Sequence, residues 1–349
     1  MRTMLALPRW LWANLKNEVF VLPSRSFVLA GCVALLVLPL AWDDPYVLRV
    51  LTMAAIFAIF AASWDLLAGY TGQVNFGHAL FFGVGAYASA LLSRHFGLDP
   101  WITVPVGALA AMGSGFLVGI PCLRLRGAYL SLATLAFPLI VTSILFAFPD
   151  FSGGELGISG LKRLVISPAA NYYVAVVLML IAVFAMWKIG DSDIGLLFHA
   201  IREDEVAARA SGINTVRYKL LAFTLSALFA GISGALFAHY LRVAGPSSLE
   251  VALSFQVVIW AIFGGTATIF GPVIAVFALY PLTELLASFE LFREVRLLAF
   301  ALVVLVVLLF MPRGLAPWVR DKIEIVCPRC KNRNVFTRHE CRLCSAELT

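Results

Sequence analysis

Charged side chains are scarce in this chain of 349 residues. Asp, Glu, Lys and Arg together make up 13% of it, whereas 61% is hydrophobic and the mean hydropathy is +0.93. Apolar runs of about 16 to 22 residues recur along most of the length, which is typical of membrane-spanning segments rather than of a globular core. The composition therefore argues against an ordinary soluble domain and predicts a polytopic membrane protein.

Three further patterns are missing from the sequence. Strict alternation of apolar and polar residues does not occur, so the spans are expected to be helices, which satisfy their own backbone groups in lipid. No Gly-x4-Gly-Lys-Ser/Thr motif is present, so we expect no ATP site in this chain. The first apolar run lacks a clean small-residue cleavage site and is interpreted as a retained helix. The expected fold class is an all-α polytopic membrane protein.

The apolar runs predict about ten membrane-spanning helices. They cover residues 26–42, 47–68, 74–93, 100–120, 128–148, 171–188, 219–241, 251–267, 270–288 and 295–311. Basic residues favour cytoplasmic loops, and this bias places both termini in the cytoplasm. We expect an N-terminal cytoplasmic segment over 1–25, a transmembrane domain over 26–318 and a cytoplasmic tail over 319–349. The net charge of +6 then reflects cytoplasmic loops, and no nucleic-acid partner is expected.

One stretch carries too much charge to lie in lipid. It reads "HAIREDEVAARASGIN" (199–214), and its charged residues are Arg202, Glu203, Asp204, Glu205 and Arg209. Charges at a helix centre cost about 2.5–3.5 kcal/mol each on insertion scales, so five would cost on the order of 12–17 kcal/mol. Helix-start residues at 191–193 and a stop at Gly212 predict one cytoplasmic helix over about 194–211, with Val206 on its apolar face. A solvated loop helix and a docking element both fit these residues.

Six segments of the chain, taken in order, resemble the signatures of one family. They are "GYTGQVNFGHALFFGVGAY" (69–87), "LRLRGAYLSLATLAF" (123–137), "SGGELGISG" (152–160), "AIREDEVAARASGIN" (200–214), "FGGTATIFGP" (263–272) and "PRGL" (312–315). Over about 26–320 the chain resembles the permease subunits of branched-chain amino acid ABC importers, the LivM-like family.

This resemblance implies a role for the charged stretch and a set of partners. The loop 189–218 would be the coupling loop that docks on two cytosolic ATP-binding subunits. The coupling residues would be Ile201, Arg202, Glu203, Asp204, Glu205, Ala207, Ala208, Arg209 and Gly212. The other implied partners are a second, LivH-like permease subunit, an extracytoplasmic substrate-binding protein and the lipid bilayer. The implied location is the plasma (inner) membrane of a bacterium or archaeon.

A few polar residues fall inside predicted spans, where side chains normally face the bundle or a wet cavity. Candidates for lining the substrate pathway are Gln73, Asn75, His78 and Glu284, and the alternative for them is interhelical hydrogen bonding. Asp65 is interpreted as an interfacial residue. The Gly and Pro residues of 264–272 predict a turn or a broken helix.

The tail contains two Cys-x2-Cys pairs separated by ten residues. They are Cys327 with Cys330 and Cys341 with Cys344, a spacing typical of a tetrahedral Zn(II) site, with His339 as an alternative ligand. Four thiolates leave no open position, which predicts a structural zinc ribbon. Disulfides are disfavoured because the tail is expected in a reducing compartment.

These observations together favour a non-catalytic permease subunit of an ABC importer. The resemblance implies leucine, isoleucine and valine as substrates. Three alternatives stay open: a permease for urea or short amides, a membrane-anchored zinc-ribbon scaffold or regulator, and a self-contained channel or secondary transporter.

Overall fold

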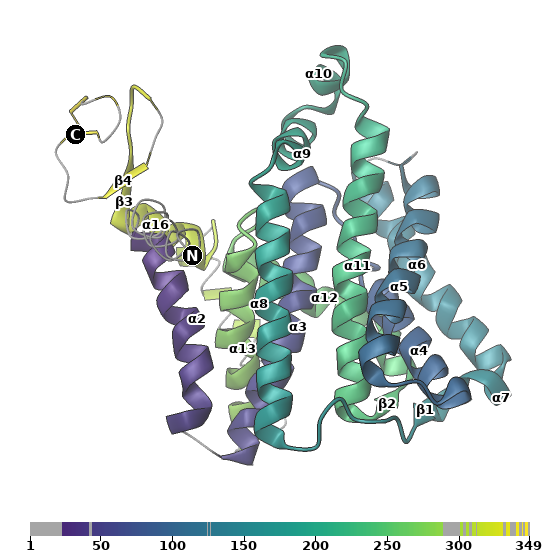
Figure 1. Cartoon of the computed structure of the whole chain (residues 1–349). Helices are drawn as coiled ribbons and strands as arrows, with labels where there is room; N and C mark the ends of the chain where they lie inside the picture. Colours follow the sequence, from purple (N-terminus) through teal and green to yellow (C-terminus); the bar gives the residue numbers. More distant parts are fainter. Residues whose placement is uncertain are drawn as a thin grey trace, which may run out of the picture.

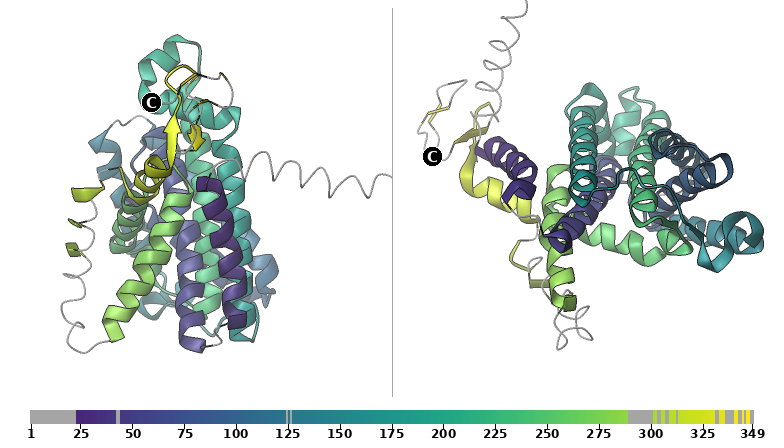
Figure 2. Two further views of the ribbon diagram at one scale, coloured as in Figure 1. Left: turned by 90° about the vertical axis from the view of Figure 1, so that its left-hand side faces the viewer. Right: turned by 60° about the horizontal axis from the view of Figure 1, so that its bottom comes forward.

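The computed structural model of the protein describes residues 23–41, 44–123, 125 and 127–288, followed by shorter C-terminal stretches. Those stretches are 301–302, 305–306, 309–311, 313–330, 333–335, 340–341, 344 and 346–347. Most of the described chain is helical, and the long helices form one bundle with a small tail at its edge (Figure 1, Figure 2).

The helices of the bundle follow one another through short connections. In chain order they are α2 (Pro23–Ala41), α3 (Pro45–Thr71), α4 (Ala79–Phe96), α5 (Pro100–Cys122), α6 (Ala128–Ala147), α7 (Pro149–Ser152), α8 (Pro168–Gly190), α9 (Asp193–Glu203), α10 (Glu205–Ala210), α11 (Thr215–Leu241), α12 (Val251–Gly264) and α13 (Phe270–Ser288). We call the end of the bundle that carries α9 and α10 the coupling end, and the opposite end, where α3 begins and α11 ends, the far end (Figure 1).

Short non-helical elements complete the bundle. They are the 3₁₀ turns η2 (Gly154–Leu156) and η3 (Pro246–Leu249) and the strands β1 (Ile158–Ser159) and β2 (Val243–Ala244). The two strands pair antiparallel at the far end, with Ile158 opposite Ala244 (Figure 1). The sequence did not predict this strand pair, although the mostly helical architecture fits the expected class.

Six of the described helices are long and apolar enough to cross a membrane, so the expected ten spans are not confirmed. The six lie within α3, α5, α6, α8, α11 and α13, while α2 and α12 contain shorter apolar helical segments. The predicted span 251–267 ends at Gly264, after 14 helical residues. The predicted span 295–311 and the N-terminal segment 1–25 fall largely outside the described residues.

Helices α3 and α5 both begin at the far end, and the same capping pattern marks each start. Asp44 and Asp99 have extended backbones, and each accepts a hydrogen bond from the N–H two residues on, at 2.8 and 3.0 Å. A proline occupies the first helical position after each of them, where its missing N–H costs nothing. The Asp-Pro pairs therefore fix where α3 and α5 begin.

The centre of the bundle is α3. Its most apolar 18-residue window is 94% buried, and α8, α11, α12 and α13 pack around it. Behind α3, helices α4, α5 and α11 approach closely because small residues face one another. A Cβ added at Gly85 would lie 2.4 Å from the carbonyl oxygen of Gly231, so only glycine allows this crossing.

A first break interrupts the helices after α3. The span predicted over 74–93 becomes helical only at Ala79, because after the C-cap at Gly72 the chain over 73–78 is not helical. Side chains replace them: the Trp64 indole donates to the carbonyl of Asn75 at 2.7 Å. The N–H of Phe76 donates to the Thr134 hydroxyl at 3.1 Å. Non-helical backbone at membrane depth needs such partners.

A second break separates α12 from α13, as the Gly and Pro residues of this region predicted. The interpretation of Asp65 as an interfacial residue is wrong, because its side chain is fully buried against this turn. Its carboxylate accepts the backbone N–H groups of Ala267, Thr268 and Ile269, at 2.6, 3.0 and 2.9 Å. Ala267 and Ile269 have φ values of 61° and 57°, a left-handed conformation that the carboxylate helps to hold.

The tail begins with α16 (Leu315–Ile323), which packs against α12, α13 and α2. The predicted domain boundary at 318/319 falls inside this helix. An antiparallel hairpin follows, β3 (Glu324–Val326) with β4 (Arg333–Val335), and it lies toward the coupling end, beside α2 and α16 (Figure 1, Figure 2).

We predict that Asp65→Ala strongly destabilises the protein. Three buried N–H groups would lose their acceptor, and each unsatisfied donor costs roughly 1–3 kcal/mol. The thermal unfolding temperature of the purified protein in detergent measures the effect. Asp99→Ala is the matched control, because it removes an exposed cap worth about 1 kcal/mol. Equal melting temperatures for the two variants would contradict the role of Asp65.

Candidate functional site

The charged stretch forms two helices at the outer tip of the bundle rather than one. The single helix expected over about 194–211 is wrong: α9 ends at Glu203 and α10 begins at Glu205 (Figure 1). Asp204 breaks the helix with φ −152° and ψ 104°, and its carboxylate accepts the N–H groups of Val206 and Ala207 at 2.8 and 3.0 Å. Asp204 is thus the N-cap of α10, a position that aspartate favours over a helix interior.

Helix α9 is tied to the end of α3. Phe198 and Ile201 are buried, and the His199 ring packs on Tyr70 with centroids 4.7 Å apart. Burial, reinforced by the Arg202 charge, lowers the pKa of His199 below its ordinary value. The Arg202 guanidinium donates to the carbonyl oxygen of Gly69, in the last turn of α3. Any displacement of α9 therefore acts on α3.

Helix α10 is tied to α11 by a charge cluster. The Glu205 carboxylate accepts from Lys219 at 2.7 Å and from Arg209 at 2.9 Å. Lys219 is largely buried at the start of α11, so this contact is stronger than an ordinary surface ion pair. Glu205, predicted as a coupling residue, contacts the chain itself, as does Ala208, which is buried.

The remaining predicted coupling residues face outward. Glu203, Ala207, Arg209 and Gly212 are exposed. Val206 is 69% exposed at the tip of the molecule, although the predicted coupling set did not include it. A single exposed apolar side chain is common on protein surfaces, so its exposure alone does not define a contact surface. The sequence did contain a signal for Val206, because this residue lies on the predicted apolar face of the stretch.

Two of the four predicted pathway residues form an interhelical network. The His78 ring lies 2.9 Å (Nε2) from the Ser63 hydroxyl and 3.4 Å (Nδ1) from the Asn75 amide, and Asn75 accepts the N–H of Gly77 at 2.8 Å. All of these groups are buried. These hydrogen bonds hold the broken segment 72–78 against α3. Interhelical hydrogen bonding was the alternative to a pathway role for these residues.

The other two pathway candidates lie apart from each other. Gln73 is buried near the coupling end, and its side-chain oxygen has no hydrogen-bond partner among the described residues. Glu284 lies on α13 toward the far end, where the Tyr46 hydroxyl donates to its backbone carbonyl at 3.5 Å. The structure therefore does not bring the four residues into one cluster.

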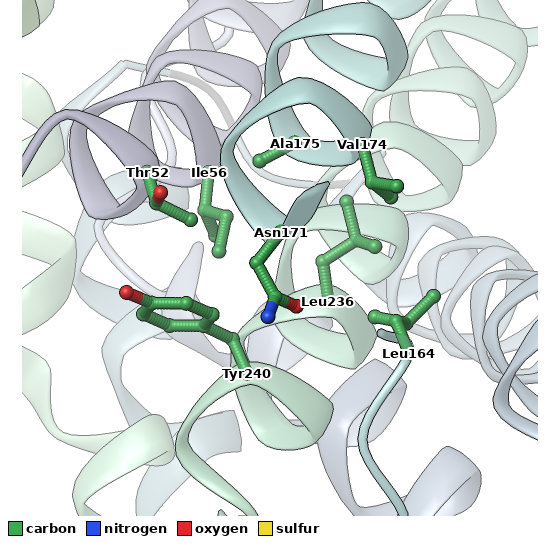
Figure 3. A pocket seen from close by; sticks show the side chains of 8 residues that line it. All are labelled: Thr52, Ile56, Leu164, Asn171, Val174, Ala175, Leu236 and Tyr240. Atoms are coloured by element: carbon green, nitrogen blue, oxygen red, sulfur yellow. The ribbon is translucent and has the colours of Figure 1, made fainter. Parts of the chain in front are cut away.

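A small cavity that the sequence did not predict lies between α3, α8 and α11 toward the far end. It is lined by Thr52, Ile56, Leu164, Asn171, Val174, Ala175, Leu236 and Tyr240. Figure 3 shows the Tyr240 ring along one side, its hydroxyl pointing toward Thr52, and aliphatic side chains on the other sides. The space has room for no more than about one water molecule, so it is a packing void rather than a small-molecule site.

The four tail cysteines lie together. Their sulfur atoms are all within 4.8 Å of one another, with 3.6 Å between Cys327 and Cys344 and 3.4 Å between Cys330 and Cys341. A tetrahedral ZnS4 site with bonds of 2.3 Å has sulfur–sulfur edges of about 3.8 Å, so the geometry fits Zn(II). The predicted alternative ligand, His339, lies outside the described residues.

The fold explains why these sulfurs converge. The first pair sits in the turn of the β3–β4 hairpin, and the second lies inside the bridge between Glu340 and Glu347. The N–H groups of Cys330 and Arg329 lower the pKa of the Cys327 thiol, which favours the thiolate.

The long helices are apolar, and the backbone groups of the two non-helical breaks are hydrogen-bonded by residues of the bundle itself. Charged residues gather at one tip. These features define a multi-pass membrane protein. The chain belongs to the family described as "Branched-chain amino acid transport system / permease component", which it matches over residues 46–311.

Individual relatives agree with this assignment. The chain is 32% identical to the high-affinity branched-chain amino acid transport system permease protein LivM of Escherichia coli (strain K12), over 84% of this chain and 76% of the relative. It is 25% identical to LivH of the same organism, over 76% and 92%. It is 23% identical to the ribose import permease protein RbsC of Haemophilus influenzae, over 85% and 95%. No solved structure gives a significant match.

We predict that the purified protein carries one firmly bound metal ion per chain and loses it when Cys327 and Cys344 are both changed to serine. Elemental analysis of the protein measures the content. Changing Cys32 and Cys122 to serine is the matched control, because neither lies near the cluster, and it should leave the metal in place. A wild-type protein without metal after purification in the absence of chelators would refute the site.

Proposed function

We propose that this chain is the transmembrane permease subunit of an ABC importer for leucine, isoleucine and valine, driven by separate ATPase subunits. Family membership over 46–311 carries the proposal. The outward tip formed by α9 and α10 supports it, because its exposed Val206 and charged groups offer a contact to a cytosolic protein. The chain itself contributes no hydrolysis chemistry.

The internal contacts of this tip suggest how an ATPase could act on the bundle. Closure of two ATPases would displace α9 and α10. Arg202 would carry the displacement to the last turn of α3, and Glu205 would carry it to α11 through Lys219. These are the two longest helices, each of 27 residues. The bundle would then rock between outward and inward access rather than deform locally.

The orientation follows from the same assignment. The coupling end would face the cytoplasm, as its basic tail also favours. The tail hairpin lies toward this end, which agrees with a cytoplasmic C-terminus (Figure 1). The far end, with the β1–β2 pair, would receive the extracytoplasmic binding protein. A LivH-like second permease would complete the pore.

For the tail we propose a structural Zn(II) site. Four thiolates fill the coordination sphere, so the ion stabilises the fold and has no position for a substrate. Among the described residues of the tail, few are buried apart from the β3–β4 hairpin and its cysteines, and metal binding would supply folding free energy there.

Transport by the complete complex tests the main proposal. Coexpressed with its two ATPases, the second permease and the binding protein, and reconstituted in vesicles, the chain should take up leucine only when ATP is present. Ribose and urea serve as competing solutes. Leucine uptake without ATP would favour a secondary transporter, and uptake of urea but not leucine would overturn the substrate.

A single substitution tests the coupling surface. We predict that Val206→Asp abolishes copurification of the ATPases and lowers uptake more than tenfold, because it places a charge in the apolar contact. Leu156→Asp is the matched control: Leu156 is 89% exposed but lies on η2, away from α10, so ATPase binding should persist. ATPases that still bind the Val206→Asp protein would refute this surface.

A further inference from the structure

The start of α16 is packed against the turn between α12 and α13 by direct backbone contact. A Cβ added at Gly265, in this turn, would lie 2.4 Å from the Cδ atom of Pro317, which is buried. A Cβ added at Gly314, just before α16, would lie 2.4 Å from the Cα atom of Gly265. Gly265 and Gly314 have φ values of 105° and 87°, a region that residues other than glycine rarely adopt. The contact between α16 and the turn therefore depends on these two glycines.

The turn that α16 contacts is the one that Asp65 holds from α3. Gly265 lies two residues before Ala267, whose N–H donates to the Asp65 carboxylate at 2.6 Å. In addition, a Cβ added at Gly69 of α3 would lie 2.6 Å from the backbone nitrogen of Ala267. Helix α16, the turn and the coupling end of α3 therefore lie in succession, each in contact with the next.

The other end of α16 runs directly into the hairpin that carries the first two cysteines. The helix ends at Ile323 and β3 begins at Glu324, whose N–H donates to the carbonyl of Arg320 in the last turn of α16. Glu324 pairs with Val335 of β4. With nine residues, α16 is shorter than the roughly 12–15 residues that a helix needs to persist alone in water. Its order therefore depends on what holds its two ends.

The hairpin at that end is organised around the cysteines. Cys327 and Cys341 are buried, and the hydrophobic residues other than cysteine that pack against them, among the described residues, are Ile325 and Ala346. The Asn334 amide on β4 donates to the Cys341 sulfur at 3.5 Å, a contact that suits a thiolate ligand. So small an apolar cluster gives little hydrophobic stabilisation, and a metal ion bound to all four sulfurs would supply what the cluster lacks.

The cysteine cluster is also open to exchange with its surroundings. Cys330 is exposed and Cys344 is half-buried, whereas the other two cysteines are buried. A chelator can therefore reach the sulfurs and withdraw even a firmly bound ion.

We propose that occupancy of this four-cysteine site by Zn(II) regulates the permease by holding α16 against the α12–α13 turn. With the ion bound, the hairpin anchors the C-terminal end of α16, while Gly314 and Pro317 keep its start on the turn. Without the ion, the hairpin loses its centre, α16 loses one of its two supports, and the turn becomes free to open. Transport then slows, because the turn adjoins the end of α3 that Arg202 contacts. This inference rests on the proposed importer function and deepens it by naming a metal that regulates it.

Hydrogen exchange on the complete complex, measured by mass spectrometry, tests the link between the metal and the turn. Zinc is removed with TPEN, which spares the magnesium that the ATPases need, and elemental analysis confirms the removal. The amides of residues 267–269 should then exchange at least tenfold faster, and added Zn(II) should restore their protection. The amides of β1 and β2, at the far end, are the internal control and should not change.

Leucine uptake by the reconstituted complex tests the regulation itself. Uptake should fall at least threefold when zinc is withdrawn and recover when zinc is returned. The double variant Cys327→Ser/Cys344→Ser should show the lower rate throughout and respond neither to TPEN nor to zinc.

Gly314→Ala separates docking of α16 from metal binding. The variant should keep one metal ion per chain, but the added Cβ would push α16 away from the turn. The amides of 267–269 should then exchange faster, and uptake should fall, even with zinc present. Gly31→Ala is the matched control, because a Cβ at Gly31 meets no atom of the described residues within 4 Å. It should match wild type in both measurements.

The outcomes of the two proposals can be told apart. Unchanged exchange at 267–269, or unchanged uptake, after complete removal of zinc would overturn the regulation and leave the importer intact. A Gly314→Ala protein that behaves as wild type would overturn it too. A zinc-loaded wild-type complex that takes up no leucine would instead overturn the proposed function.

Discussion

The constraint on which this structure depends is that lipid offers no partner to a backbone N–H or C=O group. Unbroken helices meet the constraint by themselves, but this chain breaks its helices at 72–78 and again between α12 and α13. Neighbouring residues of α3 contribute to both breaks: the Trp64 indole donates to the first, and the Asp65 carboxylate accepts from the second. A buried carboxylate is tolerated at Asp65 because three N–H groups replace its water.

Contacts from α9 and from the α12–α13 turn meet at the C-terminal end of α3. A Cβ added at Gly69 would lie 2.1 Å from the Asp65 carboxylate oxygen, so only glycine fits between Asp65 and the α12–α13 turn. The carbonyl oxygen of Gly69 also accepts a hydrogen bond from the Arg202 guanidinium on α9. The charged tip, α3 and the α12–α13 turn are therefore connected through consecutive contacts at one residue.

The sequence predicts what local pattern determines and misses what distant contacts determine. Hydropathy located most of the long helices, glycine and proline located the α12–α13 turn, and cysteine spacing located the cluster of four cysteines. The role of Asp65 could not be predicted, because its partners lie 202 to 204 residues away. The break at Asp204 was missed because aspartate suits both a charged helix face and a cap. The contact of Glu205 with Lys219 at 2.7 Å was likewise not predicted, because the two residues lie 14 positions apart.

The middle of the bundle is closed by aromatic packing. The Phe57 ring lies 5.3 to 6.3 Å from the rings of Phe82, Phe237, Trp260 and Tyr280, which come from four different helices. A zwitterion that entered among these rings would lose its hydration without gaining charged partners. In the proposed importer, α3 would have to move relative to these helices before a solute could pass. The contacts of Arg202 with Gly69 and of Glu205 with Lys219 reach both α3 and α11, so the proposed coupling helices would be placed to transmit that movement.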